Sequence, residues 1–309
     1  MNHFTYQNGG LCCEDVRIED IAAQVGTPFY LYSSATLKRH FTAFESGFAG
    51  MAHQTCFAVK ACSNLAILNL FAKLGSGADI VSGGELFRAL KAGIAPEKII
   101  YSGAGKTCKE LAEALQADIL MFNVESPQEL NRLNQVAAEL NKIARIAFRI
   151  NPDVDPKTHP YISTGLKKNK FGLTSQAALD VYRDAHRMTH IDVKGIDCHI
   201  GSQITEAGPF RDALLRLRGL IDQLAREKIA IRVVDMGGGL GITYRDEQPP
   251  HPKAYADAIR EGLAGLDVRL VLEPGRVIVG NAGVLVTRVL YRKEGDHKSF
   301  MVVDAGMND

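Results

Sequence analysis

The sequence predicts an α/β protein built on a (β/α)8 barrel of the TIM type, with an incomplete β-rich second domain formed by its N- and C-terminal segments. Eight short runs rich in Ile, Val and Leu recur along the chain, and amphipathic segments with helical spacing separate them. Continuous apolar runs of this kind are typical of strands covered on both faces, as in parallel sheets. The series occupies about 240 residues, the usual size of such a barrel.

The predicted strands follow one another at regular intervals. They cover residues 55–59, 78–82, 98–102, 117–123, 144–150, 193–200, 231–236 and 268–273. Helices are predicted between them, among others at Glu85–Ala92 and Ser126–Leu140, where Ser126 is an N-cap residue and Pro127 occupies the first turn. The alternative is an open doubly wound sheet. Eight repeats favour the barrel, and the first strand is not followed by the GxGxxG motif of dinucleotide-binding domains.

The two ends of the chain have a different pattern. Residues 1–33 and 274–309 are predicted to be extended, because GVLVTRVLYRKEG and HKSFMVVDAG alternate and contain Val, Thr and Tyr. These segments hold too few strands for a closed β domain. We therefore expect a barrel domain over 34–273 and a β-rich domain to which 1–33 and 274–309 contribute, with the remaining strands supplied by a longer protein or by another chain.

Composition narrows the class of protein. The 309 residues include 36 Lys plus Arg and 35 Asp plus Glu, so the net charge is +1 and no nucleic-acid partner is indicated. The six cysteines are scattered and do not form the paired CxxC motifs of a zinc site. The N-terminus lacks the pattern of a signal peptide, and no apolar run approaches the ~18 residues of a membrane span. These features indicate a reduced, cytoplasmic protein.

Polar residues cluster where the predicted strands end. Barrel enzymes place their reactive groups at the carboxyl ends of the strands, so these residues are expected to share one rim. The set comprises Lys60, Asp79, Ser82, Arg149, His199, Gly201, Ser202, Gly237, Gly238, Gly239, Glu273, Pro274, Gly275 and Arg276.

The loops that follow the last two predicted strands indicate a phosphate site. The loops after strands seven and eight of a barrel often bind phosphate, and here they contain Gly237–Gly239 and Gly275. Glycine allows backbone N–H groups to approach an anion closely, and Arg276 adds a positive charge. A glycine run alone could equally be a flexible turn. Its occurrence in both expected loops favours phosphate.

Lys60 is the candidate reactive amine. A lone lysine after a strand more often marks the exit of the chain to solvent. In a partly desolvated barrel mouth, however, its pKa would be lowered and it could form an imine with a carbonyl compound. With a phosphate site at the same rim, that compound could be pyridoxal 5′-phosphate (PLP). Glu273 would then keep the pyridine nitrogen protonated, and His199 would either stack on the ring or be a satisfied core histidine.

The motifs FAVKACSN, HIGSQ, MGGGLGI and EPGR, in this order and spacing, resemble the alanine-racemase-like (fold type III) PLP-dependent decarboxylases. Residues 149–172 and 11–33 resemble more specifically the diaminopimelate decarboxylase family. The likeness covers essentially the whole chain. The EPGR motif and the glycine run are shared with ornithine and arginine decarboxylases, so they specify the superfamily, whereas the 149–172 segment specifies the family.

The resemblance implies a role for each matching residue. Lys60 would hold PLP through a Schiff base, His199 would stack on the ring, and both would be catalytic. Glu273 would pair with the pyridine nitrogen, and Arg276 would also meet a substrate carboxylate. The loop around 161–170 would border the active site. The remaining cofactor-binding positions implied by the family are Asp79, Arg149, Ser202, Gly237, Gly238, Gly239, Pro274 and Gly275.

The reaction implied by the family is the decarboxylation of meso-2,6-diaminopimelate to L-lysine and CO2, the last step of lysine biosynthesis. Alternatives are a related decarboxylase for ornithine, arginine or carboxynorspermidine, an amino-acid racemase that uses a second base, and a PLP-binding or regulatory protein without turnover. The related decarboxylases differ in how the far end of the substrate is held. A racemase differs from all of them because it releases no CO2.

The sequence departs from the family in one respect. Family members continue well beyond a segment like VVDAGMND, and that continuation supplies a cysteine in a Cys-Glu-Ser motif and a tyrosine. These act at the active site of the neighbouring subunit in a head-to-tail homodimer. The 309 residues contain no Cys-Glu-Ser motif and end before the segment that would supply that tyrosine, so we expect this chain by itself to have little activity.

Overall fold

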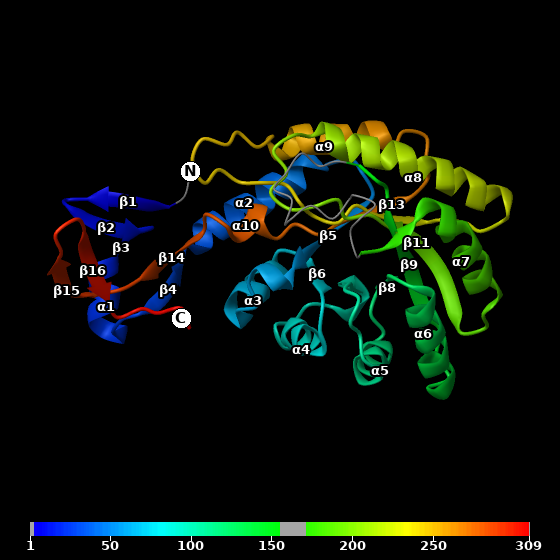
Figure 1. Ribbon diagram of the computed structural model, residues 1–309, viewed down its shortest axis with the longest axis horizontal. Coiled ribbons are helices and arrows are strands. Elements are labelled where there is room, and N and C mark those ends of the chain that lie inside the picture. Colours follow the sequence, from blue (N-terminus) through cyan, green and yellow to red (C-terminus); the bar gives the residue numbers. More distant parts are fainter. Residues whose placement is uncertain (1–2, 155–170, 309) are drawn as a thin grey trace. The chain divides into compact units, whose positions relative to one another are not determined.

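The computed structural model describes residues 3–154 and 171–308 (Figure 1). Contacts divide the chain into two compact units, residues 42–277 and residues 1–41 with 278–309. The first unit contains the parallel barrel and the second is built mainly of short antiparallel strands. Each is described below by itself.

The larger unit is a closed barrel of eight parallel strands. Its hydrogen-bonded order is β5-β6-β7-β8-β9-β11-β12-β13, and β13 pairs with β5 to close the ring. The predicted fold class is therefore confirmed. The strands are β5 His53–Ala58, β6 Gly77–Ile80, β7 Ile99–Tyr101, β8 Met121–Val124, β9 Ala144–Asn151, β11 Ile191–Asp197, β12 Val233–Asp235 and β13 Arg269–Leu272.

Helices connect successive strands of the barrel. They are α3 Leu65–Lys73, α4 Gly83–Lys91, α5 Cys108–Ala117, α6 Pro127–Glu139, α7 Ser175–Arg187, α8 Gly208–Arg226 and α9 Pro252–Gly262, with short turns η1 Val59–Ala61 and η2 Pro96–Lys98 and an added strand β10 Leu173–Thr174 beside β9. The helix α2 Ser34–Gly47 precedes β5. Both specifically predicted helices are confirmed as α4 and α6, and the Ser126 hydroxyl accepts the Glu129 N–H at 3.1 Å.

The fourth predicted strand begins too early. Residues 117–120 of the predicted 117–123 run form the end of α5 and a turn, and the strand starts at Met121. Asp118 adopts a left-handed conformation with φ of 60° as the cap of α5. A left-handed residue terminates the helix and reverses the chain, so the strand cannot begin before it.

The interior of the barrel changes from apolar to polar along the strands. Met121 and Val271 belong to a buried apolar cluster with Cys56, Ile100 and Ala147. Alternate residues of a strand face the same side, so the next inward positions on these two strands are Asn123 and Glu273, both buried. The carboxyl ends of the strands therefore enclose a polar layer above an apolar core.

The second unit contains three small antiparallel sheets. β1 Phe4–Gln7, β2 Gly10–Cys13 and β3 Val16–Arg17 form one, β4 Phe29–Tyr32 pairs with β14 Gly283–Val286, and β15 Val289–Glu294 pairs with β16 Ser299–Val303. The terminal segments, predicted to be extended, are helical at α1 Ile18–Val25 and at α10 Arg276–Val279. In α1 the residues Glu19 and Asp20 occupy the first turn, where negative charge favours a helix.

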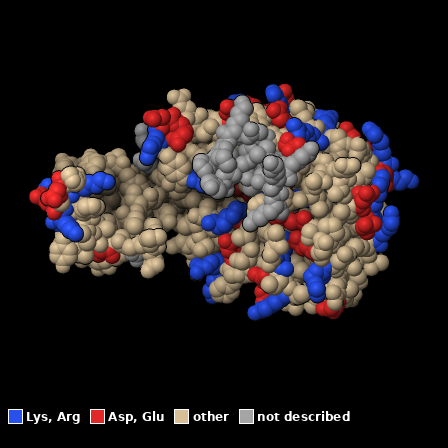
Figure 2. Space-filling model, in the orientation of Figure 1, with Lys and Arg blue, Asp and Glu red and all other residues tan. Residues whose placement is uncertain are grey.

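Charges of both signs are interspersed on the face of the barrel seen in Figure 2. This distribution matches the nearly neutral net charge of the chain. None of the helices in the described part of the chain is long and apolar enough to cross a membrane.

Candidate active site

Lys60 lies in the turn that follows the first barrel strand. β5 ends at Ala58, and Lys60 is the middle residue of η1. The loop after the last strand fixes this turn, because the Ala58 N–H donates to the Pro274 carbonyl at 3.0 Å. Gly275 lies so close that an added Cβ would be 3.0 Å from the Ala61 Cβ. The two ends of the barrel sequence therefore meet around Lys60.

Two carboxylates surround the Lys60 amine. Its Nζ donates to Asp79 Oδ2, and Asp79 is fully buried at the end of β6. Burial alone would lower the pKa of Lys60, but the charges of Asp79 and Glu273 outweigh it and raise the pKa above its usual value. The predicted lowering of this pKa is therefore wrong for the protein without a ligand. The amine is held as an ammonium, and Asp79 is positioned to accept its proton.

Glu273 directly follows the last barrel strand and lies in a network of polar groups. The Ser102 hydroxyl donates to Glu273 Oε1 at 3.2 Å, and Asn123 Nδ2 donates to the same oxygen at 3.4 Å. Burial, then the charges of Asp235 and Asp79, raise the pKa of Glu273 well above its usual range. A carboxyl in such surroundings becomes ionised when a cation is placed against it.

His199 follows β11 and is held as a neutral ring. Burial, together with the nearby charges of Arg149 and Lys60, lowers its pKa well below its usual value. The Gly238 N–H donates to His199 Nδ1 at 3.2 Å. Because Nδ1 is the acceptor, the proton of the neutral ring is on Nε2.

The glycine run after β12 packs where side chains cannot fit. An added Cβ on Gly238 would be 2.2 Å from the Glu273 carbonyl oxygen. An added Cβ on Gly239, whose φ is +114°, would be 2.4 Å from the Gly201 carbonyl oxygen. The loops after β11, β12 and β13 therefore approach one another backbone to backbone.

Arg276 contributes a charged donor at the same rim. Its Nη1 donates to the Tyr244 hydroxyl, and its guanidinium lies 5.6 Å from the centre of the Tyr244 ring. Its Nε is buried and lacks a hydrogen-bond partner among the described residues. A buried cationic donor without a partner is suited to bind an anion.

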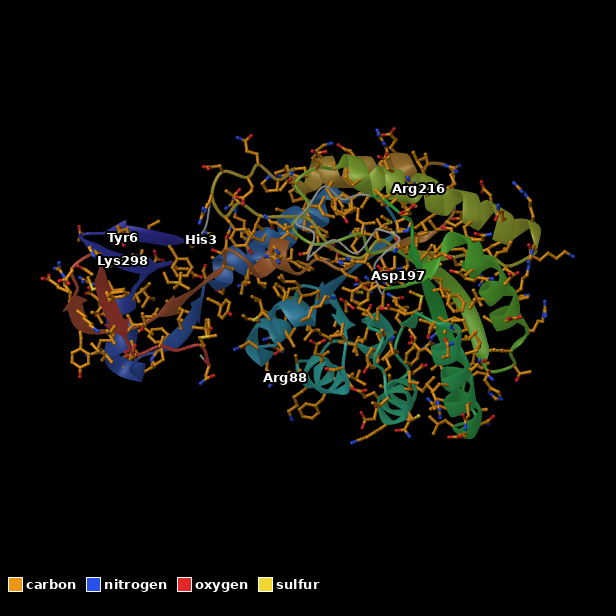
Figure 3. All side chains as sticks on the ribbon, in the orientation of Figure 1. His3, Tyr6, Arg88, Asp197, Arg216 and Lys298 are labelled. Carbon is orange, nitrogen blue, oxygen red and sulfur yellow. The ribbon has the colours of Figure 1, made fainter. Side chains whose placement is uncertain are left out.

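Arg149 forms the opposite wall of the site. Its Nη1 donates to Glu125 Oε1 at 2.9 Å, in an ion pair whose side chains are only 11% and 3% exposed. Its guanidinium stacks 4.7 Å from the centre of the Phe171 ring. Asp197, labelled in Figure 3, ends β11 nearby, and burial raises its pKa well above the usual range.

Two cavities meet these residues at the mouth of the barrel. One, of about 250 Å³, includes Ser202, Gly238, Gly239, Gly275 and Arg276, and the other, of about 330 Å³, includes Ser102, Arg149, Phe171 and Asp197. Both are lined by Lys60, His199 and Glu273. A reactive amine, a buried carboxyl and an unpartnered cationic donor at glycine-rich loops fit an aldehyde cofactor that carries a ring nitrogen and a phosphate.

Comparison with known proteins agrees with this chemistry. The family described as "Pyridoxal-dependent decarboxylase, pyridoxal binding domain" matches residues 34–280. The diaminopimelate decarboxylase of Vibrio cholerae is 56% identical over 311 residues, covering 100% of this chain and 75% of that protein. The chain belongs to the diaminopimelate decarboxylase family. The corresponding protein of Pseudomonas aeruginosa is 54% identical, with coverage of 100% of this chain and 74% of that protein.

A solved structure of the family shows the same fold. The crystal structure of Helicobacter pylori diaminopimelate decarboxylase complexed with L-lysine is 44% identical, with a TM-score of 0.91, and the match covers 94% of this chain and 73% of that one. Membership of the diaminopimelate decarboxylase family makes this chain a PLP-dependent decarboxylase by descent, with PLP as its cofactor.

The structure brings most of the predicted site residues together. Five residues of the predicted set do not line the cavities: Asp79, Ser82, Gly201, Gly237 and Pro274. The Gly237 carbonyl accepts the Glu273 N–H at 2.7 Å and the Pro274 carbonyl accepts the Ala58 N–H at 3.0 Å, so both support residues that do. Ser82 is instead the N-cap of α4, where its hydroxyl accepts the Glu85 N–H at 3.2 Å. Asp79 accepts a hydrogen bond from the Lys60 amine. The loop around 161–170 that the resemblance places at the active site lies outside the described residues.

Sequence reasoning missed a set of buried polar residues inside the barrel. They are Ser102, Asn123, Glu125, Asp197 and Asp235. Each is one of the last two residues of a barrel strand of the structure or directly follows one, in an otherwise apolar run. A buried polar residue at that position of a barrel strand is a usable signal, because its side chain points into the site or supports one that does.

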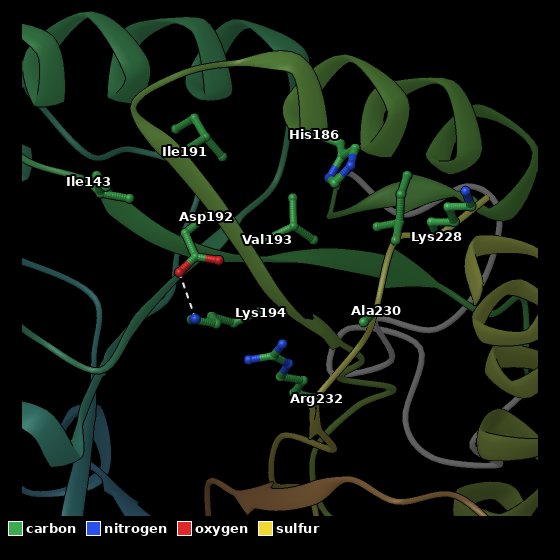
Figure 4. Close-up of a pocket in the computed structure, with 10 residues that line it drawn as sticks. Ile143, His186, Ile191, Asp192, Val193, Lys194, Lys228, Ala230 and Arg232 are labelled. Carbon is green, nitrogen blue, oxygen red and sulfur yellow. Dashed lines mark ion pairs between the residues drawn. The ribbon is translucent and has the colours of Figure 1, made fainter. Parts of the chain in front are cut away.

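A third cavity lies at the opposite end of the strands and takes no part in this site. It measures about 380 Å³, and its lining includes Ile191 and Asp192 at the start of β11, with Lys194, Lys228 and Arg232 (Figure 4). An ion pair of 2.6 Å joins Asp192 to Lys194. In barrel enzymes the amino end of the strands contributes to stability rather than to chemistry.

Proposed function

We propose that this protein decarboxylates meso-2,6-diaminopimelate to L-lysine and CO2 with PLP as cofactor. The observation that carries the proposal is the meeting of Lys60, His199 and Glu273 in the cavities at the barrel mouth, in a chain of 45–56% identity to several diaminopimelate decarboxylases. The 44% identical relative whose crystal structure is complexed with L-lysine supports the same substrate class.

We propose these roles for the side chains. Lys60 holds the cofactor through its amine, after Asp79 Oδ2 accepts a proton from Nζ. His199 presents its neutral ring face to the cofactor ring, and Glu273 lies against the ring nitrogen. Bound PLP supplies an electron sink for the pair left when CO2 departs.

Arg276 and the glycine loops would hold the anionic groups. The buried Nε of Arg276 and the loop residues Ser202, Gly238, Gly239 and Gly275 are assigned to the phosphate and the adjoining substrate carboxylate. Gly237 and Pro274 support these loops from behind. Arg149 lines the second cavity, where its ion pair with Glu125 and its stacking on Phe171 fix the guanidinium.

We also propose a division into domains, in which residues 34–273 form the PLP-binding domain and 1–33 with 274–309 contribute to the β-rich domain.

We further propose that the protein is a cytoplasmic homodimer. The apolar side chains of Tyr291, Phe300 and Met301, on β15 and β16, are exposed on the smaller unit. This supports the proposal that a partner packs against them. Light scattering of the purified protein would give the dimer mass, and a monomer would contradict this part of the proposal.

The reaction is tested with the protein in the full length that its gene encodes. CO2 and L-lysine released from meso-diaminopimelate are measured with PLP present, next to the Lys60→Ala variant. We expect equal amounts of both products from the wild type and at least a thousandfold lower rate from the variant, because covalent cofactor attachment is lost. Release of CO2 from ornithine or arginine but not from diaminopimelate would refute the substrate, and racemisation without CO2 would refute the reaction.

A further inference from the structure

Asp235 and Glu273 form a carboxyl pair in the middle of the barrel. Asp235 ends β12 and is fully buried, and its carboxyl group is hydrogen-bonded to that of Glu273. Asn123 Nδ2 donates to both, at 2.9 Å to Asp235 Oδ2 and at 3.4 Å to Glu273 Oε1. Two buried carboxyls in contact cannot both be ionised, so the pair holds a proton.

The two members of the pair face different surroundings. Glu273 lines both cavities together with Lys60, whose positive charge acts on it. Asp235 lines neither cavity and lies behind Glu273. The Gly237 N–H donates to Asp235 Oδ1 at 2.9 Å, which ties the carboxyl to the start of the glycine run. Asp235 therefore acts through Glu273 and not on a ligand.

We propose that Asp235 is a positioning residue that holds the shared proton when the cofactor is bound, leaving Glu273 ionised against the ring nitrogen. The inference rests on the proposed function. The proton moves across the hydrogen bond from Glu273 to Asp235, so no charge enters or leaves the pair. Asp235 then donates to Glu273 and keeps its oxygen oriented, while its other oxygen still accepts the Gly237 N–H.

The charges around the pair support this assignment. A cation beside Glu273 favours its ionised form, and Lys60 already lowers the pKa of Glu273 in part. Asp235 faces two further carboxyls, Asp197 and Asp79, which disfavour its ionised form, while Asn123 and the Gly237 N–H favour it. Burial and the Asp197 charge outweigh these two hydrogen bonds and raise the pKa of Asp235 to about 7. Its protonated form is therefore accessible at neutral pH.

The test compares Asp235→Asn, which keeps a donor toward Glu273 without a charge, with Asp235→Ala, which removes it. PLP dissociation constants of the apo-proteins are measured at pH 8 by absorbance titration. We expect Asp235→Asn to stay within about threefold of wild type and Asp235→Ala to bind at least tenfold more weakly. Equal loss in both variants would mean that the charge of Asp235 is needed, and equal binding by all three proteins would mean that Asp235 takes no part.

An infrared measurement keeps the proposal testable if Asp235→Ala fails to fold. In the PLP-loaded protein at pH 8 we expect the carbonyl stretch of a protonated carboxyl that shifts on isotope labelling of aspartate and is absent from Asp235→Asn, which distinguishes Asp235 from the buried Asp197. If only glutamate labelling shifts such a band, the proton is on Glu273 and the proposal is overturned. Failure of the wild type to bind PLP at all would instead overturn the proposed function, and the same band in the apo-protein would still show whether the pair is protonated.

Discussion

Removing the Glu125 carboxylate should cost the barrel more stability than any exposed ion pair. Glu125 Oε1 accepts from Arg149 Nη1 at 2.9 Å, and its Oε2 accepts the Gly172 N–H at 3.2 Å. Both side chains of the ion pair are nearly buried, at 11% and 3% exposure. The Glu125→Ala variant would leave the Arg149 guanidinium buried without its ion-pair partner, which costs about 3–5 kcal/mol.

The loss of unfolding free energy is measured by urea unfolding of the apo-protein, with Glu113→Ala as the matched control. Glu113 also pairs with a cation, but its partner Lys109 is 3.8 Å away and the side chains are 84% and 44% exposed. Such a pair contributes about 0.3–0.5 kcal/mol. We expect the loss of stability in Glu125→Gln to lie between those of Glu125→Ala and Glu113→Ala, because the amide oxygen of the glutamine still accepts one hydrogen bond. A loss below about 1 kcal/mol for Glu125→Ala would refute the reasoning, because Arg149 would then have another way to be satisfied.

Three further predictions follow from the same structure. Gly238→Ala should weaken PLP binding at least tenfold in an absorbance titration, since its Cβ would be 2.2 Å from the Glu273 carbonyl oxygen, whereas Gly105→Ala, with open space around it, should not. Lys106→Met should lower the free energy of unfolding by about 3–5 kcal/mol in urea, because the Glu129 carboxylate, 2.7 Å from Nζ and only 9% exposed, loses its cationic partner. Asp235→Asn should become more stable relative to wild type as pH rises from about 4 to above 7. Folding raises the pKa of Asp235 from 3.8 to about 7, so the wild type loses stability as pH rises between these two values, whereas the variant does not. The difference in unfolding free energy between the two proteins should change by at most about 4 kcal/mol over this pH range. A difference that stays constant with pH would contradict the prediction.

The barrel could be predicted because its signals are local. Each strand is a run of apolar residues long enough to cross the core, and Ser126 with Pro127 marks a helix start without reference to the rest of the fold. The start of the strand at Met121 could not be predicted from hydrophobicity, because Ile119 and Leu120 are equally apolar. The left-handed cap at Asp118 decides it.

The candidate site could be predicted only in part. Lys60, Glu273 and Arg276 follow strands and so are visible as polar residues at the rim. Asp235 and Asn123 lie within strand runs, and their pairing with Glu273 joins residues more than 35 positions apart. The direction of the Lys60 pKa shift depends on how closely Asp79 and Glu273 approach it. Burial alone suggests the opposite sign, and only the three-dimensional arrangement decides between them.

The central claim is that Lys60 carries PLP at the mouth of this barrel. The protein is loaded with PLP, reduced with borohydride, digested and analysed by peptide mass spectrometry, next to Lys60→Ala and the control Lys109→Ala, whose side chain is 84% exposed on α5. We expect the pyridoxyl mass on the peptide that contains Lys60 in the wild type and in Lys109→Ala, and on no peptide in Lys60→Ala. A label on another lysine, or one that persists in Lys60→Ala, would contradict the claim.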